Sequence, residues 1–175
     1  MNKNKGFTLI ELIIYVTAFA IITTILTLFV FNFINVYTKI RITKEVSEGS
    51  QIAMETMLLE IKHAKDIYAP TSSFDSHPGQ LSLETEKDTP TGEEILYIDF
   101  YLDDNNRLCM KKEGQESEPL TPENIEINNL IFNYLTINGV ESIRIELLAN
   151  YKNRTERITH QATTTIISTA NLRND

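Results

Sequence analysis

The chain has 175 residues and a formal net charge of −8 at pH 7. This length suits one membrane segment and one domain with its own core, and the negative charge opposes nonspecific binding to DNA through phosphate contacts. Cys109 is the only cysteine, so an intramolecular disulfide is excluded, and we expect a small buried apolar residue at that position.

The chain begins with a short basic segment, then Gly6, then an apolar run that holds one carboxylate, Glu11. No other charged residue appears until Lys39. A carboxylate inside a membrane-length segment costs about 2.5–3.5 kcal/mol on insertion scales, so Glu11 calls for a partner or a function. The alternative is an interfacial carboxylate that extends toward the lipid headgroups.

The segment 12–31 contains no charged residue, glycine or proline. Twenty such residues are enough for a helix to cross a bilayer. A secretory signal peptide has a shorter apolar region and ends in a small-residue cleavage site, which is absent here. The threonines in this segment are tolerable because a threonine hydroxyl can bond back to its own helix.

The charges that flank this segment do not determine the topology. Lys3 and Lys5 precede it, and Lys39, Arg41 and Lys44 follow it closely. Counting of flanking positive charges therefore leaves the orientation undecided.

The helix is predicted to continue past the membrane. Apolar residues recur at steps of three and four, with Gly49 in phase, and charged residues such as Glu60 mostly fill the other faces. We expect the helix to end near Ile67, before Pro70. The alternative is two helices broken near Asn32–Asn35. The apolar stripe consists of Ile42, Val46, Ala53, Met57, Ile61 and Ala64.

The remainder of the chain is predicted to form loops and then β-structure. Residues 69–94 are rich in turn-forming residues, with a short strand at Leu81–Glu84. Alternating patterns and turn residues after them predict five strands, the first two joined as a hairpin. The predicted fold class is therefore α+β, with one long helix packed on an antiparallel sheet of about five or six strands. The five later strands are Ile95–Leu102, Arg107–Lys112, Ile125–Ile137, Glu141–Tyr151 and Arg157–Thr169.

Patterns typical of a catalytic, cofactor or metal site are not found, and we expect a protein that is not an enzyme. The histidines are scattered, without metal-ligand spacing. Oxygen ligands for calcium near Asp103 stay an open alternative, although an ordinary β-turn is the favoured interpretation. The cluster of Lys152, Arg154 and Arg157 is interpreted as a solvated hairpin end and not as a contact with DNA.

The run Gly6-Phe7-Thr8-Leu9-Ile10-Glu11-Leu12 resembles the prepilin processing motif of type IV pilins and type II secretion pseudopilins. In that family a prepilin peptidase cuts after the glycine, and the new first residue is N-methylated. The resemblance implies that Gly6 ends the leader, Phe7 becomes the methylated amino terminus, and Glu11 meets an amine during assembly.

Two further stretches, 58–67 and 163–174, resemble W-type minor pilins and J-type minor pseudopilins. The absence of a cysteine pair, and of a proline in the helix, departs from the pattern of major pilins.

The resemblance implies a leader at 1–6, a transmembrane and assembly helix at 7–36, and an extracytoplasmic domain at 37–175. The expected protein crosses the cytoplasmic membrane once. Its implied partners are prepilin peptidase, other pilin or pseudopilin subunits and membrane lipid, without DNA. The alternative is a membrane-anchored binding module of a DNA-uptake or secretion machine. Type IV pilus, type II secretion and competence systems all stay open.

Overall fold

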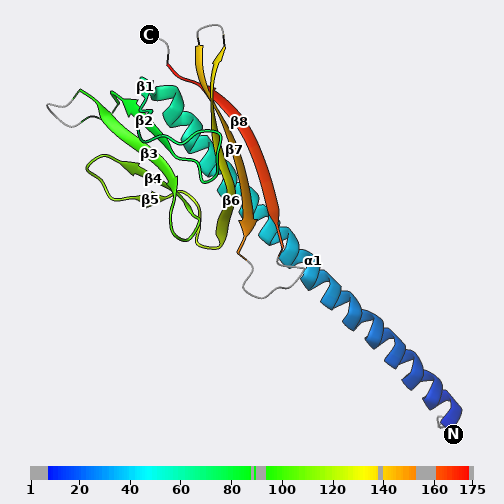
Figure 1. Ribbon diagram of the computed structural model, residues 1–175. Helices are drawn as coiled ribbons and strands as arrows, with labels where there is room; N and C mark the ends of the chain where they lie inside the picture. The colour runs from blue at the N-terminus through cyan, green and yellow to red at the C-terminus, as the bar shows by residue number, and fades with distance from the viewer. Residues whose placement is uncertain (1–7, 88, 90–93, 138–139, 153–160, 174–175) are drawn as a thin grey trace.

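The chain consists of one very long helix with a β-rich domain on its C-terminal half (Figure 1). The computed structural model describes residues 8–87, 89, 94–137, 140–152 and 161–173. Helix α1 runs from Leu9 to His63 without interruption, so the alternative of a break near Asn32–Asn35 is wrong. Thr8 caps its start, where the backbone N–H of Glu11 donates to the threonine hydroxyl at 3.3 Å.

Helix α1 ends earlier than the predicted Ile67, and strand pairing is the reason. The backbone N–H of Lys65 donates to the carbonyl of Glu84 at 2.7 Å. Asp66–Ile67 then form the short strand β1, which pairs with β2. The chain therefore leaves the helix as soon as a neighbouring strand offers hydrogen bonds to its backbone.

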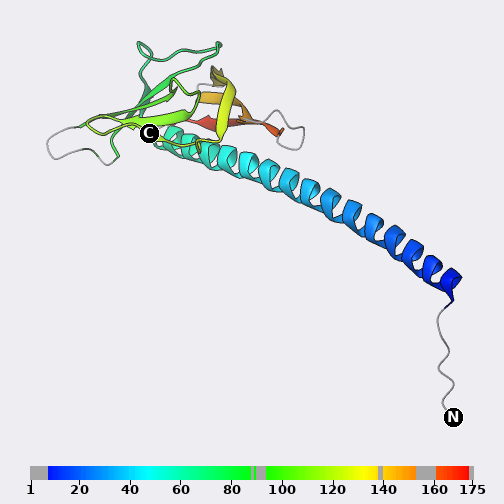
Figure 2. The same ribbon diagram turned by 90° about the horizontal axis from the view of Figure 1, so that it is seen from below.

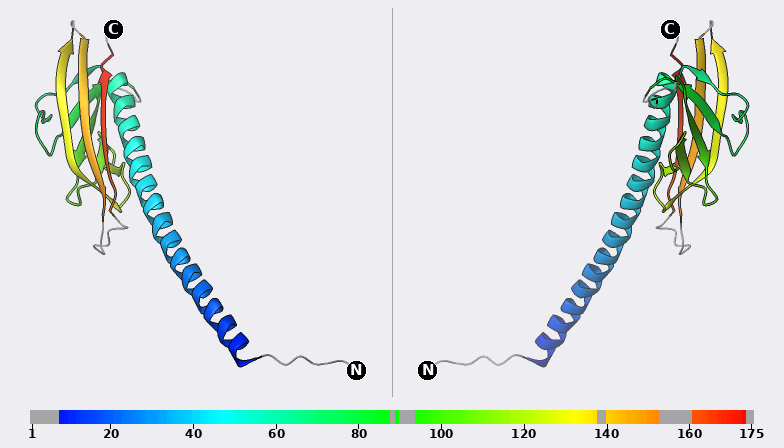
Figure 3. Two further views of the ribbon diagram at one scale, coloured as in Figure 1. Left: turned by 90° about the vertical axis from the view of Figure 1, so that its right-hand side faces the viewer. Right: turned by 90° about the vertical axis from the view of Figure 1, so that its left-hand side faces the viewer.

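Among the described residues, the domain contacts α1 along its second half (Figure 3), where the buried residues of the helix lie. Every residue of the predicted apolar stripe is buried, which confirms the amphipathic pattern. The prediction for Glu60 is wrong, because this residue is 7% exposed and faces the domain. The buried residues of the helix are Ile42, Val46, Gly49, Ser50, Ala53, Met54, Met57, Glu60 and Ile61.

The first sheet contains five antiparallel strands in the order β1-β2-β3-β4-β5. The turn at Asp103–Asn106 joins β3 to β4, with Leu102 opposite Leu108, so the predicted hairpin is confirmed. The bounds after β1 are Leu81–Thr85 for β2, Leu96–Leu102 for β3, Leu108–Lys112 for β4 and Glu118–Pro119 for β5.

The second sheet contains three antiparallel strands in the order β6-β7-β8, at Ile125–Ile137, Val140–Tyr151 and Thr163–Asn171. The first two match their predicted ranges closely. The last begins at Thr163 and extends beyond the predicted Thr169 to Asn171. Of its predicted stretch, residues 157–160 lie outside the described residues, and residues 161–162 are not part of the strand.

The fold class is confirmed as α+β, but the strands form two sheets and not the single sheet expected. A loop occupies the edge of β6 where a strand of the first sheet would otherwise pair. The N–H groups of Asp75 and Gly79 donate to the carbonyls of Phe132 and Leu130, both at 2.9 Å. Nδ1 of His77 accepts from the N–H of Leu130 at 3.1 Å. These bonds satisfy the edge of β6 and separate the two sheets.

The helix and both sheets share one hydrophobic core, which includes Met57, Phe100 and Phe132. Helix α1 lies against β8 and β7 (Figure 2). Gly49 allows the helix to approach the start of β6, because a Cβ there would lie only 2.6 Å from Cδ1 of Ile125. Close packing thus explains a glycine in the middle of a helix, where it costs about 1 kcal/mol.

Candidate membrane and assembly segment

The N-terminal half of α1 presents apolar side chains with no covering element from the described part of the chain. Its large hydrophobic residues from Leu9 to Ile40 are each more than half exposed, from 52% at Ile34 to 77% at Leu9. An apolar surface of this size is not stable in water. Among the described residues, α1 is the one helix long and apolar enough to cross a membrane. Lipid or other apolar helices must therefore cover it.

The polar side chains within this apolar half are satisfied by the helix itself. Thr17 donates to the carbonyl of Ile13 at 2.7 Å. Three further hydroxyls make the same bond one turn back at 2.8 Å, which confirms the expectation for these threonines and leaves no need for water around them. These are the hydroxyls of Thr23, Thr24 and Thr27.

The length of the uncharged segment matches a whole bilayer. Lys39 follows Glu11 by 28 residues, which is about 42 Å of helix. A bilayer measures about 40–45 Å when its headgroup regions are included. If Glu11 lies at one headgroup boundary, Lys39 lies at the other.

Glu11 lies in the first turn of α1 and is partly exposed. The Tyr15 hydroxyl, one turn further along, donates to its Oε1 at 3.5 Å. Within the described residues, Glu11 forms no ion pair. Gly6 and Phe7, the predicted cleavage site and new amino terminus, lie outside the described residues. The structure therefore places the carboxylate at the start of the helix but does not test its predicted partner.

The turn at Asp103 uses its carboxylate internally. Oδ1 accepts from the N–H groups of Asn105 at 2.9 Å and Arg107 at 2.8 Å, and Oδ2 lies 2.7 Å from an Nη atom of Arg107. Burial alone would raise the pKa of Asp103, but the hydrogen bonds from Arg107 and Asn105 outweigh it and hold the pKa below its usual value. The β-turn interpretation is confirmed. In the part of the chain that the structure describes, His, Cys, Asp and Glu form no group able to hold a metal ion.

The other sequence candidates have structural roles where they are described. Cys109 is buried, as expected, and burial raises the pKa of its thiol. His77 braces the loop on β6. The predicted basic cluster is not tested, because Arg154 and Arg157 lie outside the described residues.

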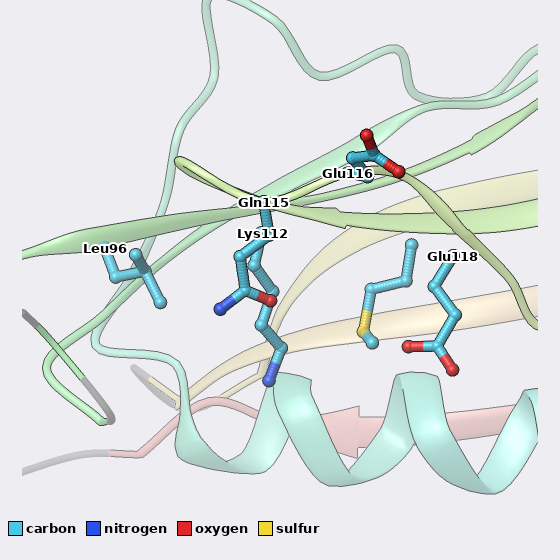
Figure 4. A pocket seen from close by; sticks show the side chains of 6 residues that line it. Leu96, Lys112, Gln115, Glu116 and Glu118 are labelled. Atoms are coloured by element: carbon cyan, nitrogen blue, oxygen red, sulfur yellow. The ribbon is translucent and has the colours of Figure 1, made fainter.

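A small cavity of about 230 Å³ lies between the end of α1 and the β4–β5 region (Figure 4). Lys112 points from β4 toward the helix, where its Nζ lies 3.2 Å from Oε1 of Glu60. Sequence reasoning missed this ion pair, although Glu60 follows the buried Ala53 by seven residues and so shares its face. The cavity is lined by Leu96, Met110, Lys112, Gln115, Glu116 and Glu118.

Comparison with known families gives a match at the amino terminus. Residues 1–27 match the family model described as the prokaryotic N-terminal methylation motif. This motif is the leader signature of type IV prepilins and pseudopilins, and it indicates a pilin-like protein anchored in a membrane by one helix. It also implies processing by prepilin peptidase and assembly with other pilins. No curated protein and no solved structure matches the chain significantly.

Proposed function

We propose that the chain is a minor pilin or pseudopilin, a non-enzymatic structural subunit of a type IV pilus-like filament. The observation that carries this proposal is the continuity of three features. The methylation motif at residues 1–27 includes the start of an exposed apolar helix, and that helix continues unbroken into the domain. A subunit of this shape can hold its domain at a membrane and later exchange lipid contacts for contacts with neighbouring helices.

Processing begins with cleavage after Gly6 by prepilin peptidase, and N-methylation of Phe7 follows. A glycine has no side chain beside the scissile bond, so the protease can reach an extended backbone there. Cleavage creates a positive amine four residues before Glu11, and N-methylation keeps that amine charged. The new charge has the sign that Glu11 requires.

Glu11 then serves as the assembly residue, paired with the amine of Phe7 in its own or a neighbouring subunit. An unpaired charge in hydrocarbon is penalised, whereas a paired one is tolerated. When the pair joins two subunits, it forms only at one axial offset between their helices, and it then selects the register of the filament. Before assembly, the hydroxyl of Tyr15 offers the carboxylate a hydrogen bond within its own helix.

Residues 37–175 form the extracytoplasmic domain in this proposal, with the leader on the cytoplasmic side. The single cysteine and the helix without proline favour a minor subunit over a major one. The W-type and J-type resemblances of residues 58–67 and 163–174 point the same way. Type IV pilus, type II secretion and competence systems remain alternatives for the machine, and the neighbouring genes distinguish them.

The substitution Glu11→Gln tests the proposal in the native host. It keeps the shape of the side chain but removes the charge, so we expect normal membrane insertion and about a tenfold loss of subunit in sheared filaments, the equivalent of 1.4 kcal/mol per contact. Carbonate extraction measures insertion, and immunoblots of the filament fraction measure assembly. Glu55→Gln, an exposed carboxylate on the same helix, is the matched control.

Two outcomes would contradict the proposal. Unchanged filament incorporation of Glu11→Gln would favour the alternative of a membrane-anchored binding module. Intact-mass measurement of the processed protein should give a chain that starts at methylated Phe7, and a chain that starts at Met1 would refute the processing step.

A further inference from the structure

Three cations follow the apolar segment within six residues, against the charge of the rest of the molecule. Lys39, Arg41 and Lys44 are all exposed, and no acidic residue lies between the first and the last of them. Without these three, the chain has 13 basic and 24 acidic residues. These three cations, here called the collar, therefore separate the uncharged segment between Glu11 and Lys39 from the rest of a strongly acidic chain.

Helical periodicity places part of this collar on a face that the domain does not cover. Tyr37, Arg41 and Lys44 follow one another at steps of four and three, so their side chains share one side of α1. Ile42 and Val46, the first buried residues of the helix, lie on the opposite side and contact the domain. Tyr37 is 63% exposed. Among the described residues, none buries Tyr37, Arg41 or Lys44, which are all exposed.

The domain offers the collar little compensation. Lys44 lies 3.4 Å from Glu48, but both side chains are more than half exposed, so this pair is worth little. Neither Lys39 nor Arg41 forms an ion pair with another described residue. In the part of the chain that the structure describes, the weak pair with Glu48 is the only ion pair of the collar, which leaves charge for an outside partner.

The position of the collar along the helix identifies that partner. Lys39 lies about 42 Å from Glu11 along the helix, which places the collar in the headgroup layer on the side of the domain. The step from Lys39 to Lys44 is about 8 Å of helix, close to the depth of that layer. Tyrosine is enriched at the same boundary, where its ring meets the acyl chains and its hydroxyl meets the headgroups.

Topology does not explain these cations. Positive residues beside a span favour the cytoplasmic side, so three of them beside an extracytoplasmic domain work against the proposed orientation. A contact with phosphate offsets that disadvantage. Arg41 can bind two phosphate oxygens through its planar guanidinium, while Lys44 contributes a flexible point charge.

We propose that Tyr37, Lys39, Arg41 and Lys44 form a binding site for anionic phospholipid headgroups in the leaflet on the side of the domain. The site fixes the depth and rotation of the subunit in the bilayer before assembly, and it keeps the acidic domain from being repelled by that leaflet. This inference rests on the membrane insertion that the proposed function requires.

Lipid preference of the full-length, uncleaved chain tests the site. The protein is purified in mild detergent and mixed with equal amounts of phosphatidylglycerol and phosphatidylcholine of matched acyl chains, and native mass spectrometry counts the lipids that stay bound. Wild type should retain phosphatidylglycerol preferentially. The single variants Arg41→Gln and Lys44→Gln should each reduce that preference roughly fivefold, which corresponds to about 1 kcal/mol per cation.

Three controls separate the possible causes. Lys62→Gln removes an exposed cation from the same helix, far from the bilayer, and should change nothing. The exchange of Arg41→Lys with Lys44→Arg keeps both charges and should retain the preference. Lys3→Gln with Lys5→Gln removes the cations of the leader, at the opposite end of the span.

Equal retention of the two lipids by wild type would overturn the inference, and so would a loss of preference confined to the leader variant. Neither result affects the proposed function, which fails separately if carbonate extracts the protein from membranes or if the processed chain does not start at Phe7.

Discussion

Individual glycines show how tightly the elements of the domain approach one another. At Gly49 the nearest atom to an added Cβ is the end of the Ile125 side chain, which can rotate. At Gly79 the nearest atoms are the carbonyl oxygen of Leu130 and Cδ2 of Phe132, both at 3.0 Å. A backbone carbonyl cannot rotate away as a side chain can, so a Cβ is tolerated less well at Gly79 than at Gly49.

Gly79→Ala should therefore weaken the docking of the loop on β6. The added methyl group forces the loop away from Leu130 and strains the hydrogen bond between the N–H of Gly79 and that carbonyl, 2.9 Å in length. We expect the free energy of unfolding to fall by about 1–3 kcal/mol, as for other overpacked sites. Urea denaturation of the full chain in detergent, followed by tyrosine fluorescence, measures this change.

Ser76→Ala is the control for that substitution, because Ser76 is an exposed residue of the same loop and its loss should cost less than about 0.5 kcal/mol. Equal free energies of unfolding for the two variants would show that the loop moves to accommodate the methyl group. The close approach of Gly79 to Leu130 would then contribute nothing to stability.

At the scale of elements, local pattern predicted most of the fold. The stripe from Ile42 to Ala64 and the strand Ile125–Ile137 follow directly from periodicities of 3.6 and 2. The division into two sheets was not predictable in this way, because it depends on a loop that hydrogen-bonds to the edge of β6. Loop positions carry no periodic signal, and pairing between distant segments is not encoded in any one of them.

In the candidate site, too, the local features were predictable from the sequence and the contacts between distant segments were not. The apolar span and the lone Glu11 are local features, so the sequence was sufficient to single them out. The ion pair between Glu60 and Lys112 joins residues 52 positions apart, from a helix and a strand. A single charged residue inside an apolar stripe indicates burial only when its partner is known, and the partner appears only in the fold.

We expect the ion pair between Glu60 and Lys112 to stabilise the contact between α1 and the first sheet. Lys112→Met keeps the aliphatic stem but leaves the carboxylate of Glu60 buried and unpaired. We expect a loss of about 1–3 kcal/mol in the free energy of unfolding, the usual range for a lost hydrogen bond to a charged group. The same urea denaturation assay measures it.

A double variant separates the pair from simple packing. Glu60→Met combined with Lys112→Met removes both charges and should recover most of the lost stability, because an apolar pair of similar volume is tolerated at such sites. Lys44→Met breaks the exposed ion pair with Glu48 and should lower the free energy of unfolding in detergent by less than about 0.5 kcal/mol. A neutral effect of Lys112→Met alone would mean that water already screens the carboxylate.

At the scale of the whole molecule, the continuity of α1 determines how the domain is oriented relative to the membrane segment. The helix is 55 residues long, and the described part of the domain packs on its second half (Figure 3). Because the helix is continuous, the axial position of Glu11 also fixes the axial position of the domain. The register that Glu11 selects between subunits therefore also determines which neighbouring domains come into contact. The collar at Lys39, Arg41 and Lys44 lies where these two parts meet.

Asn35→Pro tests whether this rigidity matters. Proline removes a backbone hydrogen bond and clashes with the preceding turn, at a cost of about 3 kcal/mol to an unbroken helix. Asn35 lies in the exposed part of α1, before the first residue buried in the domain, Ile42. We therefore expect a kink or a flexible joint at the domain-side end of the membrane segment, with the domain itself intact.

Spin labels at Ile22→Cys and Lys62→Cys, in a Cys109→Ser background, measure the joint in bilayer nanodiscs. A straight helix places the two backbone positions about 60 Å apart, and Asn35→Pro should shorten and broaden the distance distribution. Asn35→Ala should leave it narrow.

Filament incorporation should fall with Asn35→Pro while urea denaturation of the domain stays unchanged, since no domain contact is lost. Normal assembly of the Asn35→Pro variant would show that the contacts of the domain do not require a continuous helix. Glu11 would then set the register of the membrane segment alone.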